Sequence, residues 1–315
     1  ARALTLPQQF QTDNGKLTTN RTCTSLVGCS AKGGSVFNFA LRNAVRFSIV
    51  VTTPESRFSA VAFRGDLAES LGRVKRLGYQ GVELSFRDPR TVDRAGLKVL
   101  LEKQDLPVVA LATGRAWGEE GLSFTDRDPA VRRKTSARVS EYLDLARALN
   151  AMVILGLIRG RIPDGVKPSV ARRWARDAIR RAADKGARDG IRLVIEPINR
   201  YETNFLCHIE ETLTFLQEVD RPNVGILADT FHMNIEDASI SGSLRRAGRS
   251  LFHVHVADSN RWAPGCGHLD FADILGTLKA MHYPGYVSVE CLPKPDPESC
   301  PRIAMATLRK AARLP

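Results

Sequence analysis

The chain is 315 residues long, 43% of them hydrophobic, and it carries a formal net charge of +12 from 46 basic and 34 acidic residues. This length is large for one ordinary domain but lies within the range of a single α/β barrel, and the hydrophobic fraction is sufficient for a large core. No apolar run approaches the roughly 20 residues of a membrane-spanning helix. These bounds exclude a transmembrane helix and predict a soluble protein with no membrane partner.

The positive charge does not by itself indicate a nucleic-acid partner. Basic residues are dispersed along amphipathic stretches such as 172–181, without a block of like charge and without interleaved aromatic residues. We interpret them as solvated helical faces and expect no nucleic-acid partner. The six cysteines form no CxxC pair, which favours free thiols in a reducing compartment and a cytoplasmic location.

The first 44 residues differ in composition from the rest of the chain. They are rich in Ser, Thr, Asn and Gly, and Asp13 is their only acidic residue. Such a segment is typical of a transit peptide, or of translated sequence upstream of a domain. We therefore predict a poorly structured N-terminal extension over residues 1–44 and one catalytic domain over residues 45–315.

From residue 47 onward, short β-rich runs alternate with amphipathic segments. Eight runs are predicted to be strands: 47–51, 81–86, 107–113, 151–157, 192–197, 224–229, 251–256 and 286–290. Between them, apolar residues recur at helical spacing; Leu67, Leu71 and Val74, for example, share one helical face. The strands are almost continuously hydrophobic, which is typical of parallel strands buried on both faces.

Eight strand–helix units over roughly 270 residues predict the α/β class and, within it, a single closed (β/α)8 TIM barrel. The alternative is a doubly wound open sheet. That fold would more naturally place a GxGxxG motif after its first strand, and the sequence has none there.

Four consecutive predicted strands end in residues that bind divalent metals. These residues are Glu196, Asp229, His255 and Glu290. In a TIM barrel the carboxyl ends of the strands carry the catalytic residues, so the four side chains are predicted to form a metal site. Taken singly, Asp229 could cap the following helix and Glu196 could be an ordinary strand-end acid. His253, two residues before His255, is predicted to be a core histidine.

Two glutamates, one aspartate and one histidine make a hard, oxygen-rich ligand set. This set suits Mn²⁺, Mg²⁺ or Co²⁺, and it leaves coordination positions for substrate oxygens. A structural zinc site would instead be expected to use thiolates. The predicted cofactor is therefore a divalent cation, with Mn²⁺ the first choice.

Four long segments around these residues resemble one known group of enzymes. The segments are 195–204, 226–234, 253–268 and 286–293. They resemble the ketose 3-epimerases, a group of the xylose-isomerase-like barrels, and the resemblance extends from about residue 46 to the end of the chain. Nothing in that family corresponds to residues 1–44.

The resemblance implies a reaction and assigns its residues. Glu196, Asp229, His255 and Glu290 would be the metal ligands, and Glu196 and Glu290 would also be the acid–base pair. One glutamate would remove the proton next to the ketone, and the other would return a proton to the opposite face of an enediolate stabilised by the metal. The resemblance further implies that three residues in the loops after the strands contact substrate oxygens: Glu202, His232 and Arg261.

Within the group, three further segments most resemble the 5-keto-L-gluconate epimerases. They are 64–89, 121–125 and 158–161. Those enzymes interconvert 5-keto-L-gluconate and D-tagaturonate, which would make the substrate a keto-hexuronate. Arg159 and Arg161 follow the fourth predicted strand at the barrel mouth, and arginine is suited to bind a carboxylate. The alternative is that both are solvent-facing loop residues and that the substrate is a neutral keto-sugar.

Other activities use the same scaffold. A sugar isomerase that moves hydrogen between C1 and C2 could use the same metal ligands. An apurinic-site endonuclease would suit the positive charge, but it uses a histidine-rich multi-zinc centre, whereas only one of the six histidines here lies at a strand-end ligand position. A non-catalytic sugar-binding barrel would not need two opposed carboxylates. Both a monomer and a homo-oligomer are compatible with the sequence.

Overall fold

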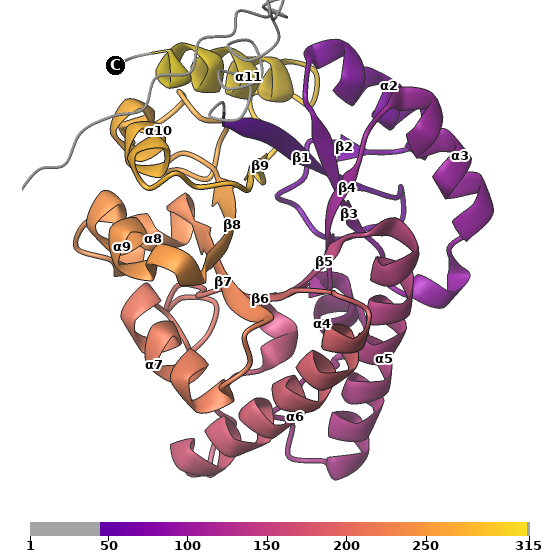
Figure 1. The fold of residues 1–315 in the computed structure, drawn as a ribbon, viewed down its shortest axis with the longest axis vertical. Helices are drawn as coiled ribbons and strands as arrows, with labels where there is room; N and C mark the ends of the chain where they lie inside the picture. Colours follow the sequence, from indigo (N-terminus) through magenta and orange to yellow (C-terminus); the bar gives the residue numbers. More distant parts are fainter. Residues whose placement is uncertain (1–44, 314–315) are drawn as a thin grey trace, which may run out of the picture. The chain divides into compact units, whose positions relative to one another are not determined.

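In the computed structural model, which describes residues 45–313, eight parallel strands form a ring in which each pairs with the next along the chain (Figure 1). These strands are β1 (Arg46–Thr52), β3 (Gly81–Ser85), β4 (Val108–Ala112), β5 (Met152–Leu155), β6 (Leu193–Ile195), β7 (Val224–Asp229), β8 (Leu251–Val256) and β9 (Tyr286–Val289). Because β1 also pairs with β9, the sheet closes on itself. The predicted TIM barrel is confirmed, and the open sheet is not formed.

Helices surround this ring (Figure 1). They are α2 (Leu67–Leu77), α3 (Arg94–Gln104), α4 (Gly114–Glu120), α5 (Pro129–Leu149), α6 (Pro168–Arg188), α7 (Ile209–Val219), α8 (Thr230–Glu236), α9 (Ile240–Ala247), α10 (Phe271–Ala280) and α11 (Ser299–Ala312). Three single 3₁₀ turns also occur: η1 (Pro89–Thr91), η2 (Leu157–Arg159) and η3 (Gly248–Ser250). A two-residue strand, β2 (Phe63–Arg64), pairs with β1 and was not predicted, since so short a run leaves no pattern in the sequence. The predicted extension over residues 1–44 lies outside the described residues.

Local sequence signals set the helix boundaries. Asp66 caps α2, because its side chain accepts a hydrogen bond from the backbone N–H of Glu69 at 2.9 Å. The same helix ends at Gly78, whose φ of 85° is in the left-handed region that glycine adopts without strain. Asp128 caps α5, which begins with Pro129 at the first helical position.

Side chains on each strand alternate between the outside and the inside of the barrel. Outward side chains pack under the helices in the main hydrophobic core. Inward side chains on β4 to β7 form a second, apolar cluster: Val109, Ala110, Met152, Ile154, Val194 and Leu227. The inward positions on the other strands include four polar side chains with no exposed surface: Ser48, Glu83, His253 and Ser288. The barrel interior is therefore apolar along one half of the ring and polar along the other.

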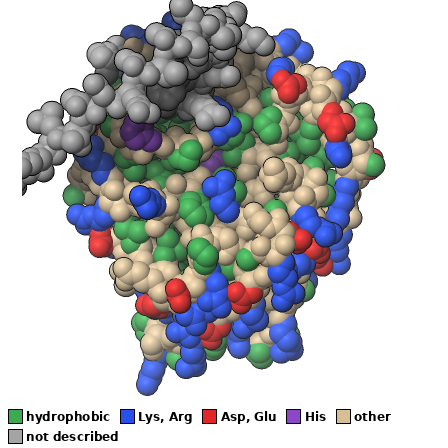
Figure 2. Space-filling view, viewed as in Figure 1, with side chains coloured by type: hydrophobic (Ala, Val, Ile, Leu, Met, Phe, Trp, Pro, Cys, Tyr) green, Lys and Arg blue, Asp and Glu red, His purple; other side chains and the backbone are tan. Residues whose placement is uncertain are grey.

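The basic residues are dispersed over the helical surface. On the face shown in Figure 2, most Lys and Arg side chains lie around the periphery with acidic side chains among them, and a few lie nearer the middle. Several form ion pairs between neighbouring helices, such as Arg172 with Glu218 at 2.8 Å. The cysteines among the described residues, which are Cys207, Cys266, Cys291 and Cys300, are free thiols. Within residues 45–313, no helix combines the length and apolarity that crossing a membrane requires.

Candidate metal centre

The four predicted metal ligands meet at the carboxyl end of the barrel. Glu196 directly follows β6, Asp229 ends β7, His255 is the penultimate residue of β8, and Glu290 directly follows β9. Each lies two residues after an inward-facing position on its own strand, so the alternation of the strand turns its side chain inward as well. Exposure is 7% for Glu196 and Glu290 and 1% for Asp229 and His255.

The Nδ1 atom of His255 lies at nearly equal distances from the three carboxylates. It is 3.8 Å from Glu196 Oε1, 3.9 Å from Asp229 Oδ2 and 3.7 Å from Glu290 Oε2. One ligand atom from each of the four residues lies within 4.8 Å of every other. The structure thus brings together one nitrogen and three carboxylate oxygens in the space that one cation needs.

The electrostatics of this cluster fit a bound cation. Burial raises the pKa of Glu196 well above its ordinary value, and the nearby Glu290 carboxylate raises it further. Burial likewise raises the pKa of Asp229 to about 6. Asp229 Oδ2 and His255 Nδ1 are buried and have no hydrogen-bond partner among the described residues. Because unpaired buried acceptors and crowded carboxylates are costly, a divalent cation at this position would relieve both.

The two carboxylate oxygens of Asp229 have different surroundings. Its Oδ1 accepts a hydrogen bond from the backbone N–H of Phe231 at 2.8 Å and so caps α8. Its Oδ2 faces the other ligands. The two sequence interpretations of this residue are therefore compatible, and the cap fixes the direction of the free oxygen.

Glu202, His232 and Arg261 line the same cavity as three of the candidate ligands, Glu196, His255 and Glu290. The cavity has a volume of about 60 Å³. Arg261 Nη1 donates to Glu202 Oε1 at 3.0 Å, and Arg261 Nη2 lies 3.8 Å from Glu290 Oε2. The structure thus places the three predicted substrate contacts next to the cluster.

His232 is held as a neutral side chain. Burial lowers its pKa well below the ordinary value, and the positive charge of Arg261 lowers it further. The Asn199 side-chain amide lies 2.7 Å from His232 Nδ1. Because the amide nitrogen can only donate, the proton of the neutral imidazole is on Nε2, which lies 4.0 Å from Asp229 Oδ2. His232 therefore presents an N–H donor beside the candidate ligands.

The loop after β8 is organised around Asp258, a residue whose role the sequence analysis did not identify. Its buried carboxylate accepts hydrogen bonds from the backbone N–H groups of Ser259 at 2.8 Å, Gly265 at 2.8 Å and Leu269 at 3.1 Å. A Cβ atom at Gly267 would overlap this carboxylate, which explains why glycine stands there. The loop holds Arg261 at a φ of 61°, a strained conformation for a residue with a side chain.

Arg159 does not lie where the sequence prediction placed it. Its side chain has no exposed surface, and its guanidinium donates to the backbone carbonyls of Gly156, Phe205 and Leu206 at 2.8–2.9 Å. Burial lowers its pKa to about 10, so it stays charged at neutral pH. Because its donors are used inside the protein, Arg159 braces the loop after β6 instead of facing the barrel mouth.

Arg161 is also not brought to the cluster. It is exposed, and it lines a separate cavity of about 500 Å³ together with Trp117, Arg127 and Asp164. The carboxylate-binding role predicted for Arg159 and Arg161 thus has no support from their positions. The two arginines that line the candidate cavity are Arg115 and Arg261.

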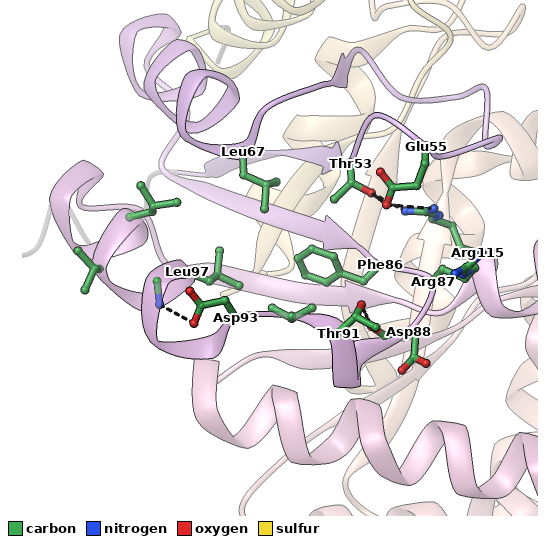
Figure 3. A pocket seen from close by; sticks show the side chains of 14 residues that line it. Thr53, Glu55, Leu67, Phe86, Arg87, Asp88, Thr91, Asp93, Leu97 and Arg115 are labelled. Atoms are coloured by element: carbon green, nitrogen blue, oxygen red, sulfur yellow. Dashed lines mark hydrogen bonds and ion pairs between the residues drawn. The ribbon is translucent and has the colours of Figure 1, made fainter.

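A larger groove of about 650 Å³ lies beside the candidate cavity and shares Arg115 with it (Figure 3). Its apolar lining includes Leu67, Phe86 and Leu97, and none of the four candidate ligands lines it. Arg115 is held in the wall between the two spaces, since its Nη1 donates to Thr53 Oγ1 at 2.8 Å. The candidate ligands therefore belong to the smaller cavity, although the groove is larger.

Comparison with known proteins agrees with this geometry. A family model described as xylose isomerase-like TIM barrel matches residues 71–311. The L-ribulose 3-epimerase of Methylomonas sp. (strain DH-1) is 35% identical over 230 residues, which cover 70% of this chain and 77% of the relative. The 3-dehydro-D-guloside 4-epimerase of Escherichia coli (strain K12) is 29% identical over 253 residues, covering 78% of this chain and 95% of the relative.

Solved structures give the same result. The crystal structure of D-allulose 3-epimerase from Methylomonas sp. in complex with D-allulose aligns with a TM-score of 0.72 at 28% identity, covering 85% of this chain and 97% of that one. The apo structure of 3-keto-D-glucoside 4-epimerase from E. coli aligns with a TM-score of 0.69 at 25% identity, covering 83% and 98%. The similarity therefore extends over almost the whole of these enzymes.

Proposed function

The chain belongs to the xylose isomerase-like TIM barrel family and is an enzyme of the isomerase class, and on this premise we propose that it is a divalent-metal-dependent sugar epimerase. It would invert the carbon next to the ketone of a keto-sugar. One observation carries the proposal: the carboxylates of Glu196 and Glu290 both face the Nδ1 atom of His255 in one buried cavity.

The proposed cation ligands are Glu196, Asp229, His255 and Glu290. This hard, oxygen-rich set favours Mn²⁺, with Co²⁺ or Mg²⁺ as substitutes. When bound, such a cation supplies Lewis-acid polarisation of the substrate ketone.

The proposed proton transfers use the two glutamates. Glu196 and Glu290 come from β6 and β9, which are separated in the ring by β7 and β8, so they approach the cavity from different directions. One carboxylate removes the proton next to the ketone, and the other delivers a proton to the opposite face. Inversion by this route needs no redox cofactor.

The proposed substrate contacts are Glu202, His232 and Arg261. His232 is neutral, and its Nε2–H can donate to a substrate oxygen next to the ligand cluster. Arg261 can stabilise negative charge that develops on the substrate, because its guanidinium lies beside Glu290 and is held by Glu202. These contacts would orient the reacting carbon between the two glutamates.

We propose a neutral keto-sugar, free or within a glycoside, in preference to the keto-hexuronate expected from the sequence. The expected acid depended on Arg159 and Arg161, and neither lines the cavity. The named relatives also support a neutral substrate, since they are epimerases of L-ribulose, D-allulose and 3-dehydro-D-guloside. An aldose–ketose isomerase could use the same ligand set and is distinguished by its product.

A product assay tests this proposal. Protein loaded with Mn²⁺ is incubated with neutral ketoses, keto-glycosides and keto-hexuronates, and the products are identified by NMR. We expect an epimer of a neutral keto-sugar as the main product. An aldose product would support the isomerase, and faster conversion of a keto-hexuronate would support the acid substrate.

A further inference from the structure

A buried carboxylate on the opposite side of the barrel holds the only histidine among the candidate ligands. Glu83 is in the middle of β3 and has no exposed surface. Its Oε2 lies 2.9 Å from His255 Nε2 and 2.9 Å from His253 Nε2. Glu83 thus connects the first part of the chain to the ligand cluster.

These contacts determine which nitrogen of His255 carries the proton. Glu83 Oε2 is a single carboxylate oxygen shared by two ring nitrogens at 2.9 Å, so it acts as the acceptor of both hydrogen bonds and the Nε2 atoms of His253 and His255 carry the protons. The Nδ1 atom of His255 is then the one that faces the three carboxylates at 3.7–3.9 Å.

A purely structural role does not account for a charge at this position. The positions that pair with Glu83 on the two neighbouring strands, Val50 on β1 and Ala110 on β4, are apolar and buried. A buried ion pair is often no more stabilising than apolar residues of similar volume. In addition, Glu83 Oε1 has no hydrogen-bond partner among the described residues, although it is buried. The presence of a carboxylate at this position is therefore better explained by its contact with His255 than by packing.

We propose that Glu83 is a positioning residue for the metal ligand His255. It fixes the ring orientation and the Nε2–H tautomer of His255, so that Nδ1 is presented to the cation. His253 donates to the same oxygen and keeps the Glu83 carboxylate in place. This inference rests on the proposed function, because it assumes that His255 binds a cation. Carboxylate partners of metal-binding histidines typically change metal affinity by about 10- to 100-fold when they are lost.

The first test is a calorimetric Mn²⁺ titration of metal-free protein, which requires no turnover. We expect Glu83→Gln, which removes the charge and keeps the shape, to bind Mn²⁺ about 10- to 100-fold more weakly than the wild type. Ser288→Ala is the matched control: Ser288 is also buried inside the barrel, pairs in register with His255, and its hydroxyl has no hydrogen-bond partner among the described residues. It should bind Mn²⁺ as the wild type does.

The outcomes separate this inference from the proposed function. Equal Mn²⁺ affinity in the wild type and in folded Glu83→Gln would overturn the positioning role alone. Two Mn²⁺ ions per wild-type chain, one of them lost in Glu83→Gln, would make Glu83 a ligand of a second site with His253 and would also overturn it. Absence of Mn²⁺ binding by the wild type would overturn both the inference and the metal-dependent function.

A second measurement needs no variant at position 83. In protein labelled with ¹⁵N-histidine and loaded with diamagnetic Zn²⁺, one histidine should bind the metal through Nδ1 and carry its proton on Nε2. The resonance should be absent in His255→Gln, which assigns it. Metal binding through Nε2 of His255 would overturn the proposal, even if Glu83→Gln failed to fold.

Discussion

Arg261 Nη1 donates to Glu202 Oε1 at 3.0 Å, and this pair joins the loop after β8 to the loop after β6 over the candidate cavity. Each of these loops follows a strand that carries a proposed ligand, namely His255 on β8 and Glu196 after β6. The pair therefore fixes two sides of the proposed site relative to one another.

Replacing Arg261 should impair catalysis more than stability. Arg261→Ala removes a charged donor beside Glu290, so we expect kcat/KM to fall about 10- to 150-fold, equal to about 1.5–3 kcal/mol. Steady-state kinetics measure this loss. Arg246→Ala is the control, because its ion pair with Glu210 on the surface is more than half exposed on both sides and should contribute little. Equal losses in the two variants would contradict a role for Arg261 at the site.

Removing the metal should abolish activity. The proposed cation, held by the four candidate ligands, would supply the Lewis-acid polarisation of the substrate ketone on which the mechanism depends. Treatment with EDTA followed by desalting should give inactive protein, and added Mn²⁺ or Co²⁺ should restore turnover. Full activity in protein that contains no metal by elemental analysis would refute the proposed mechanism.

Solvent hydrogen should appear at the inverted carbon. A carboxylate that has accepted a proton exchanges it with water between turnovers, so product formed in D₂O should carry deuterium next to the ketone. Glu196→Gln and Glu290→Gln should each lose epimerisation. If either variant still binds metal, its remaining glutamate should still exchange the proton next to the ketone with solvent, but in only one of the two epimers. An epimer formed without any label would indicate hydride movement.

Arg159 and Arg161 form a matched pair for testing the correction made by the structure. Arg159→Met leaves three buried carbonyls without a donor, so we expect the free energy of unfolding to fall by about 3 kcal/mol or more. Arg161→Met changes an exposed side chain and should stay within about 0.5 kcal/mol of the wild type. Urea unfolding measures both. A stable Arg159→Met with a raised KM for acidic sugars alone would restore the carboxylate-binding role.

Asp88 should make stability depend on pH in the acid range. A hydrogen bond from Arg90 is the largest cause that lowers its pKa, from 3.8 to about 2, with Arg138 contributing further. Since the folded-state pKa lies below the unfolded-state value, this contribution is present above about pH 4 and is lost as the pH falls towards 2. With allowance for solvent screening, we expect Asp88→Asn to cost about 1–2 kcal/mol at pH 7. The difference from the wild type in urea unfolding should shrink progressively below pH 4.

The strands and the clustering of the four candidate ligands could be predicted because both leave local signals. A buried parallel strand is a short apolar run, and the residue where it ends is the residue at the barrel mouth. Glu83 leaves a weaker signal: it is an acidic residue inside a buried strand, in the same alternation phase as Ser85 at the strand end. That phase places it inside the barrel, but only the closed ring shows that it meets His253 and His255.

Arg159 shows where this reasoning fails. Position after a strand predicts nearness to the barrel mouth, but the direction of a side chain depends on the turn that follows. Here η2 turns the chain within three residues, and the arginine points under the loop at Phe205 and Leu206. Those partners are 46 and 47 residues away along the chain, so no local pattern could reveal them.

The first strands of the ring (β1 to β5) and the last strands (β6 to β9) contribute different residues to the cavity. This difference affects how substrate preference could change between related proteins. All four proposed ligands lie on or directly after β6 to β9, whereas Ser85 lines the cavity from the end of β3, and Phe58 and Arg115 line it from the segments after β1 and β4. Changes in the first half could therefore alter which sugar is accepted while the acid–base chemistry stays intact. Glu83 is the exception, because it belongs to the first half by position and to the chemistry by contact. Among homologues that act on different sugars, we expect Phe58 and Ser85 to be replaced often and Glu83 to be retained.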